Sequence, residues 1–201
     1  AALLQAGHRV LAARRHHPPR SVRLLAETHD ALRWTQLSAH RMTEAADWQT
    51  ALEGASLVIN CVGILRQRWG ERYDDVHHRM PAALARACAS RGLPLVHTSA
   101  LGLHEQAESR FLSSKLQGER AIAASGCDHC IVRPSLIDGL GGFGASWLRM
   151  LARWPVHFVP SGAVGRIAAV QAADLGHAYA ALVRIGLAQG LTQQREANLG
   201  G

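Results

Sequence analysis

Long hydrophobic runs, lysine and tyrosine are all scarce in this sequence of 201 residues. No apolar run reaches the roughly 18–20 residues that a transmembrane helix needs, and candidates such as Ala163–Ala173 are short and interrupted. Glycine and proline occur in ordinary amounts, which excludes a fibrous or disordered chain. With 48% hydrophobic residues, the length is sufficient for one α/β domain with its own core.

Lysine occurs once, at Lys115, although the chain is basic. Lysine and arginine together number 22 against 15 acidic residues, which gives a net charge of +7. A basic chain fits nucleic acid as a partner. The arginines are nevertheless spread over the whole sequence, and a preference for arginine over lysine is typical of genome composition. We therefore do not expect direct nucleic-acid binding.

Cysteine is sparse as well, with four residues in the chain. Cys127 and Cys130 have CxxC spacing, but one such pair without a second ligand pair is a weak zinc signal. The twelve histidines include no HExxH-type spacing. We expect reduced thiols in a cytoplasmic protein, and no metal site.

Apolar strand-like runs alternate with helical patches along the chain. The predicted strands are residues 8–15, 32–37, 55–63, 93–102 with the loop that follows, 129–135, 156–160 and 166–170. The predicted helices are residues 1–7, 21–29, 43–53, 72–91, 105–125, 145–154 and 172–188. We expect a kink at Pro81. Apolar strands that alternate with helices indicate an α/β fold with a parallel sheet covered on both faces. With no internal repeat or linker, residues 1–201 are expected to form a single domain.

The carboxyl ends of the strands are the first places to look for a site, because ligands of doubly wound sheets bind there. Arg14 and Arg15 end the strand after the opening helix, where a dinucleotide fold holds the ribose of its cofactor. Two arginines suit the 2′-phosphate of NADP through bidentate, charge-assisted hydrogen bonds, and no acidic residue lies near enough to serve NAD. The alternative is a solvated charge pair at the start of a loop.

Two further strand ends carry small polar residues. Asn60 and Gly63 follow a buried strand, where a glycine either lets the backbone approach a flat cofactor ring or simply makes a turn. Thr98 and Ser99 end the next strand. A hydroxyl at that place either donates to a substrate carbonyl or satisfies the loop backbone.

The remaining candidates are a lysine and a second proline–serine pair. Lys115 lies in the middle of a predicted helix, where it is either functional or a solvated charge on the helix face. Pro134 and Ser135 end the strand after that helix. The proline either shapes one wall of a nicotinamide pocket or only stops the strand.

Together, these motifs resemble the NAD(P)-dependent epimerase/dehydratase family, which comprises extended and atypical short-chain dehydrogenase/reductases. LPLVHTSALG is similar to the strand that carries the family's catalytic Ser/Thr, SRFLSSKLQGE to its YxxxK helix, and IVRPSLIDG to its RPxxxxG strand. Asp174 takes the acidic place of another family stretch. The SALG and SR-aromatic-LxSK details favour the atypical branch, which includes the nucleotide-binding accessory subunit of respiratory complex I and NmrA-like sensors.

The resemblance implies a Rossmann-like, doubly wound parallel sheet, with residues 138–201 forming part of the substrate-side region. It assigns Ser99 and Lys115 to catalysis, although the Ser/Thr place falls on Ser99 or, one position later, on Ala100. Phe111 stands in the place of the family's tyrosine. The residues that the resemblance implies for cofactor binding are Arg14, Arg15, Asn60, Gly63, Thr98, Lys115, Pro134 and Ser135. NADP is the expected cofactor, ahead of NAD.

The first departure from the family concerns the phosphate loop, GxxGxxG, which would lie just before Ala1. That loop holds the pyrophosphate through backbone N–H groups and the dipole of the helix that follows. The chain also stops at NLGG, where relatives continue with a further strand and helices. We therefore expect the middle of a longer protein, without its first strand, that binds dinucleotide poorly as it stands.

The second departure is Phe111, four residues before Lys115 and so on the same helix face. In the family, a tyrosine at this place is the general acid/base, and the lysine lowers its pKa and holds the ribose hydroxyls. Phenylalanine has no proton to give, and Tyr73 and Tyr179 lie outside the motif. Lys115 is therefore expected to keep only the ribose-binding role.

Three functions remain open on this basis. The first is an NADP(H)-binding atypical reductase-like protein with weak classical catalysis and a redox, assembly or quinone-linked role. The second is an active NADP-dependent oxidoreductase or nucleotide-sugar epimerase/dehydratase that uses another acid, such as His104. The third is a non-catalytic interaction module. The substrate is an unidentified small molecule, and a homodimer is left open.

Overall fold

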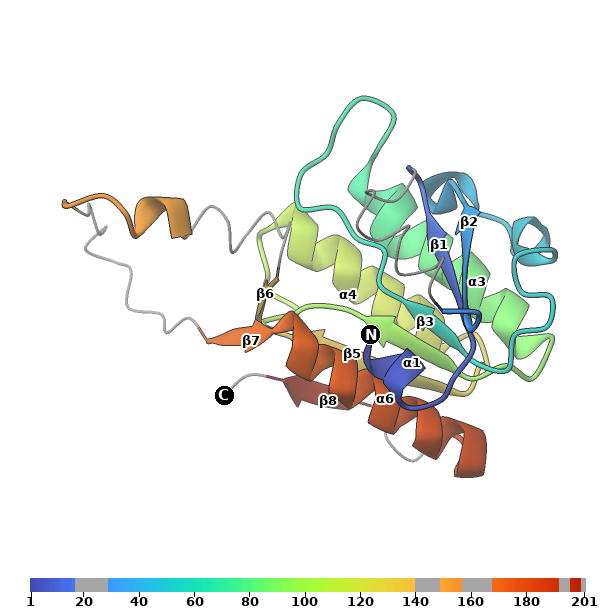
Figure 1. The fold of residues 1–201 in the computed structure, drawn as a ribbon. Coiled ribbons are helices and arrows are strands. Elements are labelled where there is room, and N and C mark those ends of the chain that lie inside the picture. The colour runs from blue at the N-terminus through green and yellow to red at the C-terminus, as the bar shows by residue number, and fades with distance from the viewer. Residues whose placement is uncertain (17–28, 140–148, 157–167, 192–195, 200–201) are drawn as a thin grey trace.

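The computed structural model describes residues 1–16, 29–139, 149–156, 168–191 and 196–199. The helix expected at 21–29 and the strand expected at 156–160 fall almost entirely outside these residues. The remaining elements form parallel sheets with helices on two sides (Figure 1).

The largest sheet has four parallel strands. In spatial order they are β3 (Val58–Asn60), β4 (Leu95–Thr98), β5 (His129–Pro134) and β8 (Glu196–Leu199). Two smaller parallel pairs are β1 (Val10–Arg14) with β2 (Leu32–Gln36), and β6 (Leu136–Asp138) with β7 (Ala169–Gln171). These pairings confirm the predicted α/β class with parallel strands.

The sheet was predicted to lack its first strand, and the described strands on the two sides of that place belong to separate sheets. Among the described strands, β1 pairs with β2 alone, and β3 pairs with β4 and no other strand. The division therefore lies between β1 and β3, which is where a sheet of order 3-2-1-4-5-6 has its first strand. Because of this division, the carboxyl end of β1 lies in a different sheet from the carboxyl ends of β3, β4 and β5.

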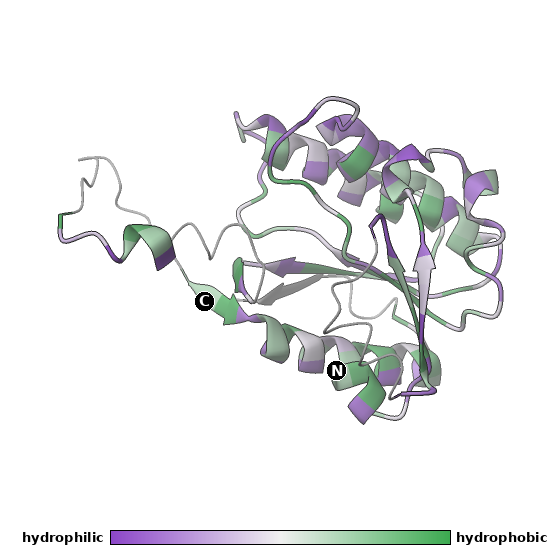
Figure 2. Ribbon diagram, turned by 45° about the horizontal axis from the view of Figure 1, so that its top comes forward, coloured by the Kyte–Doolittle hydropathy of each residue, from purple (hydrophilic) through white to green (hydrophobic). Residues whose placement is uncertain are grey.

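Helices cover both faces of the four-stranded sheet (Figure 1, Figure 2). On one face, α3 (Met80–Ala89) packs against α4 (Arg110–Ala123). On the other face, α6 (Ala172–Gln189) lies beside the short α1 (Ala2–Gln5). The remaining turns are the 3-10 helices η1 (Ala39–Arg41) and η2 (Ala45–Trp48) and the π-helix η3 (Asp75–Arg79).

Each face of the sheet has its own apolar cluster, because side chains alternate across a strand. Leu95 packs into the cluster under α3 and α4, whereas its neighbour Val96 packs into the cluster under α6. Cys127 belongs to the first cluster and Cys130 to the second, and both are free thiols. The two sulfurs of the CxxC motif therefore face opposite sides of the sheet.

Helix α4 lies unusually close to η3. A Cβ at Gly118 of α4 would collide with the carbonyl oxygen of His77, so only glycine fits there. Pro81 has no N–H to donate to that carbonyl four residues earlier, and it sits in the first turn of α3. The expected kink at Pro81 is thus a π-helical turn just before the proline, and it brings His77 against α4.

The structure differs from the prediction at residues 43–53 and at β8. Residues 43–53 do not form the predicted helix: they contain the short η2 followed by turns. Trp48 explains this geometry, because its indole is buried and its Nε1 donates to the Met42 carbonyl at 3.1 Å. The strand β8 was not predicted at all, since its sequence is polar and its pairing with β5 depends on tertiary structure.

No helix in the described part of the chain is long and apolar enough to cross a membrane. The described residues likewise contain no group of three His, Cys, Asp or Glu side chains placed to hold a metal ion.

Candidate functional site

Three parallel strands end at one edge of the four-stranded sheet. In the register, Asn60 of β3 lies opposite His97 of β4, and Thr98 of β4 lies opposite Val132 of β5. The structure thus brings together the predicted residues at the ends of β3, β4 and β5. They include Gly63, Ser99, Pro134 and Ser135. Helix α4 supplies Lys115 to the same edge.

Lys115 is buried at the end of β3. Its side chain reaches Gly63, where an added Cβ would lie 3.8 Å from Nζ, and it is only 6% exposed. Within the described residues the ammonium has no hydrogen bond or ion pair, and Glu119 on the next helical turn is paired with Arg133 instead. Burial lowers the pKa of Lys115 to about 8, an effect that the Glu119 carboxylate partly opposes.

Phe111 shares the helix face of Lys115, as the i, i+4 spacing predicts. The ammonium of Lys115 lies 5.6 Å from the centre of the Phe111 ring. The same ring meets His77 and Tyr73 edge to face, with centroids 5.3 and 6.0 Å apart, and Tyr73 stacks on His77 at 5.3 Å. An aromatic cluster of three rings therefore fills the place of the family's tyrosine.

His77 is a buried residue that the sequence analysis did not identify. Its Nε2 accepts the N–H of Ile64 at 3.1 Å, and its Nδ1 lies 3.0 Å from the Ser114 hydroxyl, which donates to the carbonyl of Phe111. This pattern requires a neutral ring with the proton on Nδ1. Burial, and secondarily the charge of Lys115, lowers the pKa of His77 to about 4.

His97 is a second buried histidine near Lys115. The amide of Asn60 donates to its Nδ1 at 3.0 Å, and the amide oxygen accepts the N–H of Val62 at 3.0 Å. Burial followed by the charge of Lys115 lowers the pKa of His97 to about 3. The Asn60 side chain is thus engaged within the protein, where it shapes the turn that leads to Gly63.

Thr98 connects the strand ends to α6. Its hydroxyl donates to the sulfur of Cys61 at 3.3 Å, so the Tyr179 phenol, 2.6 Å away, must donate to Thr98. Burial is the main cause that raises the pKa of Tyr179. Neither Cys61 nor Tyr179 was predicted at the site, because Tyr179 reaches it from a helix 81 residues farther along the chain.

Two serine hydroxyls at this edge have no hydrogen-bond partner in the described part of the chain. Ser99 is 5% exposed, and its hydroxyl forms no hydrogen bond with the described residues. The buried hydroxyl of Ser135 at the end of β5 is also without one. Buried polar atoms usually have a partner, so these two orphaned hydroxyls are the strongest geometric sign of a ligand at this edge.

The chain is similar to two curated proteins, whereas no protein-family model matches it. The ceramide reductase of Caulobacter vibrioides is 29% identical over 156 residues, 75% of this chain and 49% of that protein. NADH dehydrogenase (ubiquinone) 1 alpha subcomplex subunit 9, mitochondrial, of Mus musculus is 31% identical over 93 residues, 44% of this chain and 24% of that protein. The chain therefore spans about half the length of the first relative and about a quarter of the second.

Solved structures agree with this comparison. UDP-glucuronic acid 4-epimerase from Bacillus cereus, in complex with UDP-glucuronic acid and NAD, has a TM-score of 0.71 and 14% identity. The match covers 100% of this chain and 72% of the epimerase chain. The dTDP-4-dehydrorhamnose reductase from Bacillus anthracis, in complex with NADP, has a TM-score of 0.63 and 15% identity, covering 95% and 74%. This chain has the fold of the NAD(P)-dependent epimerases, dehydratases and reductases. The resemblance seen in the motifs, including the complex I subunit, is thereby confirmed.

In this reductase and epimerase fold, Arg14 is the last residue of β1 and Arg15 follows it. Arg15 forms an ion pair with Glu71, a buried carboxylate from the loop after β3. The guanidinium of Arg14 lies 6.0 Å from the centre of the Trp34 ring on the neighbouring strand, and its side chain is exposed. Among the described residues, an incoming anion could therefore bind Arg14 without breaking an ion pair, whereas Arg15 would have to leave Glu71.

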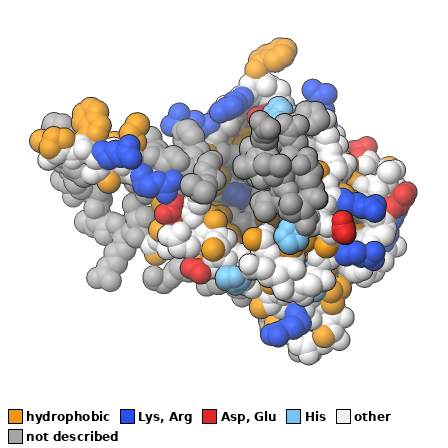
Figure 3. All heavy atoms as spheres, in the orientation of Figure 1, with side chains coloured by type: hydrophobic (Ala, Val, Ile, Leu, Met, Phe, Trp, Pro, Cys, Tyr) orange, Lys and Arg blue, Asp and Glu red, His pale blue; other side chains and the backbone are white. Residues whose placement is uncertain are grey.

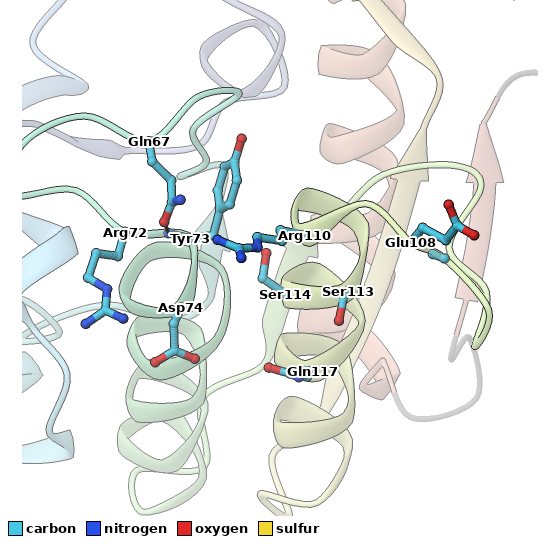
Figure 4. Close-up of a pocket in the computed structure, with 10 residues that line it drawn as sticks. Gln67, Arg72, Tyr73, Asp74, Glu108, Arg110, Ser113, Ser114 and Gln117 are labelled. Atoms are coloured by element: carbon cyan, nitrogen blue, oxygen red, sulfur yellow. Dashed lines mark hydrogen bonds between the residues drawn. The ribbon is translucent and has the colours of Figure 1, made fainter.

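An open hollow of about 320 Å³ lies beside this site, between the loop before η3 and the beginning of α4 (Figure 4). Arg110 points toward the base of Tyr73 there, whose ring is turned upward, and Ser114 lies below Arg110. Ser114 also bonds His77, so the hollow and the buried side of α4 share one residue. The hollow is lined mainly by polar side chains and carries no orphaned buried group.

Proposed function

We propose that the chain is the NADP(H)-binding core of an atypical reductase-like protein in which Lys115 holds the cofactor and the usual proton donor is missing. The observation that supports this most directly is the pair on α4. Lys115 is buried without a partner in the described structure, beside Gly63, whereas Phe111 has no proton to transfer.

The described residues fit a nicotinamide nucleotide. Lys115 can donate to the ribose hydroxyls, and these bonds would satisfy a buried ammonium that has no partner within the described chain. The orphaned hydroxyl of Ser99 can donate to a substrate carbonyl. Gly63 leaves room for a flat ring next to the backbone. The cofactor, when bound, supplies the hydride; the chain's own residues position both reactants.

The preference for NADP over NAD is part of this proposal. It rests on Arg14, whose exposed guanidinium is held over Trp34 at the end of β1 and can form bidentate bonds with a 2′-phosphate. Arg15 would contribute only if the cofactor replaces Glu71 as its partner. Asn60, Thr98, Pro134 and Ser135 are proposed to line the remainder of the cofactor site, and residues 1–201 to act as one domain.

The missing tyrosine implies slow classical turnover. His77 cannot replace it readily, since its ring is neutral and both of its nitrogens are engaged. Tyr73 donates its phenol proton to the carbonyl of Leu65. The protein would then bind NADPH and oxidise it slowly, which suits a redox-sensing or quinone-linked role.

The test is to measure NADPH binding and NADPH oxidation by the full-length protein, with and without Phe111→Tyr. We expect the natural protein to bind NADPH and to oxidise it slowly with quinones. The tyrosine variant should oxidise it at least about 10-fold faster, because acid–base catalysis typically contributes about 100-fold or more. The proposal fails if the natural protein does not bind NADPH, or if Phe111→Tyr leaves the rate unchanged.

A second candidate is an active carbonyl reductase, and one observation favours it. The curated relative that matches 75% of this chain is a ceramide reductase. In that case a substrate group or another side chain would supply the proton. Rapid NADPH oxidation with a carbonyl-bearing ceramide, unaffected by Phe111→Tyr, would support this candidate over the first. A panel of candidate substrates that includes nucleotide sugars tests for epimerase or dehydratase activity.

A further inference from the structure

The loop between β3 and η3 exposes a tryptophan completely. Residues 65–72 rise from the body of the molecule (Figure 1), and Trp69 at their tip is 104% exposed, while Leu65 at their base is 52% exposed. Among the described residues, the next most exposed large apolar side chain is Trp154, at 66%. Exposing an indole has a cost in water, so its position calls for a partner.

The loop holds a defined shape. Arg68 and Glu71 exchange both backbone hydrogen bonds, at 3.2 and 2.9 Å, around Gly70, whose φ of +77° suits the turn. At the base, the phenol of Tyr73 donates to the carbonyl of Leu65 at 2.7 Å. The tip is therefore a preformed turn that presents Trp69 outward, and little ordering entropy would be lost when it binds.

The exposed charged side chains of residues 65–72 are all positive. Arg66, Arg68 and Arg72 are exposed, whereas the one acidic residue, Glu71, is buried and paired with Arg15. Figure 3 shows a hydrophobic side chain standing out at the place of this loop, with Lys or Arg side chains on both sides of it. The loop is thus an apolar tip surrounded by positive charge.

The two acidic side chains next to the loop each have a partner on η3. Asp75 forms an ion pair with Arg79, and Asp74 is hydrogen-bonded to the imidazole of His78, each at i, i+4. Residues 65–72 contain three arginines and one acidic residue, and the chain as a whole carries a net charge of +7.

We propose that residues 65–72 form a docking loop that inserts Trp69 into the interface of an anionic membrane. Tryptophan prefers the boundary between headgroups and acyl chains, and arginines beside it are attracted by anionic lipids. The convex shape distinguishes this from nucleic-acid binding, which uses a groove with a series of aromatic platforms. The inference does not depend on the proposed function.

Docking at this loop would also place the candidate site near the bilayer. Val62 and Leu101, on the loops that leave β3 and β4, are 38% and 40% exposed at the same edge of the sheet. Both loops follow strands whose ends carry the candidate site. A substrate dissolved in the membrane would then reach the site without crossing water.

The test is cosedimentation of the full-length protein with vesicles of phosphatidylcholine alone and of phosphatidylcholine with phosphatidylglycerol. We expect binding to the anionic vesicles, weakened when salt rises from about 0.1 M to about 1 M. Trp69→Ala should weaken binding on the order of 10-fold, and Arg68→Gln about 5-fold. Trp154→Ala removes another exposed tryptophan and is the matched control, with no expected effect.

Brominated lipids give a second readout, because they quench tryptophans that enter the bilayer. Quenching should disappear in Trp69→Phe and persist in Trp154→Phe. Thermal unfolding of each variant verifies that the fold is intact. The proposal is overturned if anionic vesicles do not bind, if Trp69→Ala binds like the natural protein, or if the loop variants lose affinity for a DNA oligonucleotide while vesicle binding is unchanged.

Discussion

The two ends of the proposed cofactor site are built in opposite ways. The end around Lys115 lies in the four-stranded sheet, where Gly63, His77 and Phe111 surround a buried ammonium. The end around Arg14 lies in the two-stranded sheet and is exposed. Packing therefore determines the geometry at Lys115, whereas charge and a single aromatic contact determine it at Arg14.

This difference predicts that substitutions at the two ends have different consequences. At the buried end, a change alters folding stability together with binding, since neighbouring groups lose or gain partners in a medium of low dielectric. At the exposed end, a change should alter the choice of cofactor and leave stability almost unchanged. Three substitutions separate these effects.

Gly118→Ala should have the largest effect on stability. The added methyl group would collide with the His77 carbonyl, so α4 and η3 must move apart and Lys115 with them. We expect unfolding free energy to fall by at least about 2 kcal/mol in urea denaturation. Gly176→Ala is the control, because its Cβ would lie 3.4 Å from that of Ala2 and a helical alanine is intrinsically favourable. Equal stability of the two variants would contradict close packing at this end.

Lys115→Met should increase stability while it weakens binding. Burial lowers the lysine pKa from 10.5 to about 8, so removal of the charge at neutral pH should raise the unfolding free energy by on the order of 2–3 kcal/mol. Between pH 8 and 10.5 the folded natural protein binds fewer protons than the unfolded one, and its stability therefore rises with pH. The methionine variant should lack this rise in urea denaturation across that range. An identical pH profile for both proteins would refute a buried, charged lysine.

Arg14→Ala should have the smallest effect on stability, within about 0.5 kcal/mol, because the side chain is exposed. Loss of its guanidinium should weaken NADPH binding about 10-fold and leave NADH binding unchanged. Arg33→Ala, on the neighbouring strand of the same sheet, is the control for a general loss of positive charge. A parallel loss of affinity for both cofactors would show that Arg14 does not read the 2′-phosphate.

Much of the fold could be predicted from the sequence, because apolar runs and glycine stops mark the strands and helices locally. The strand ends with Asn60, Thr98 and Pro134 follow directly from those runs. The groups that complete the site could not be predicted in this way. His77 depends on a π-helical turn, and Tyr179 on the packing of α6 against β4. Both contacts are tertiary, and no local pattern encodes them.

The Arg15–Glu71 ion pair is another contact that could not be predicted from the sequence. Both residues were visible in the sequence, but only the fold brings the end of β1 against the loop after β3. The polar strand β8 is another case, since it owes its existence to pairing with β5 rather than to a hydrophobic pattern.

The single lysine makes the central claim directly measurable. Nitrogen-15 labelling of lysine should give one side-chain resonance for this chain, and it reports on Lys115 alone. We predict a titration midpoint near the lowered pKa of about 8, and a change in chemical shift when NADPH is added. A midpoint at 10.5, with no response to NADPH, would contradict a buried lysine that holds the cofactor.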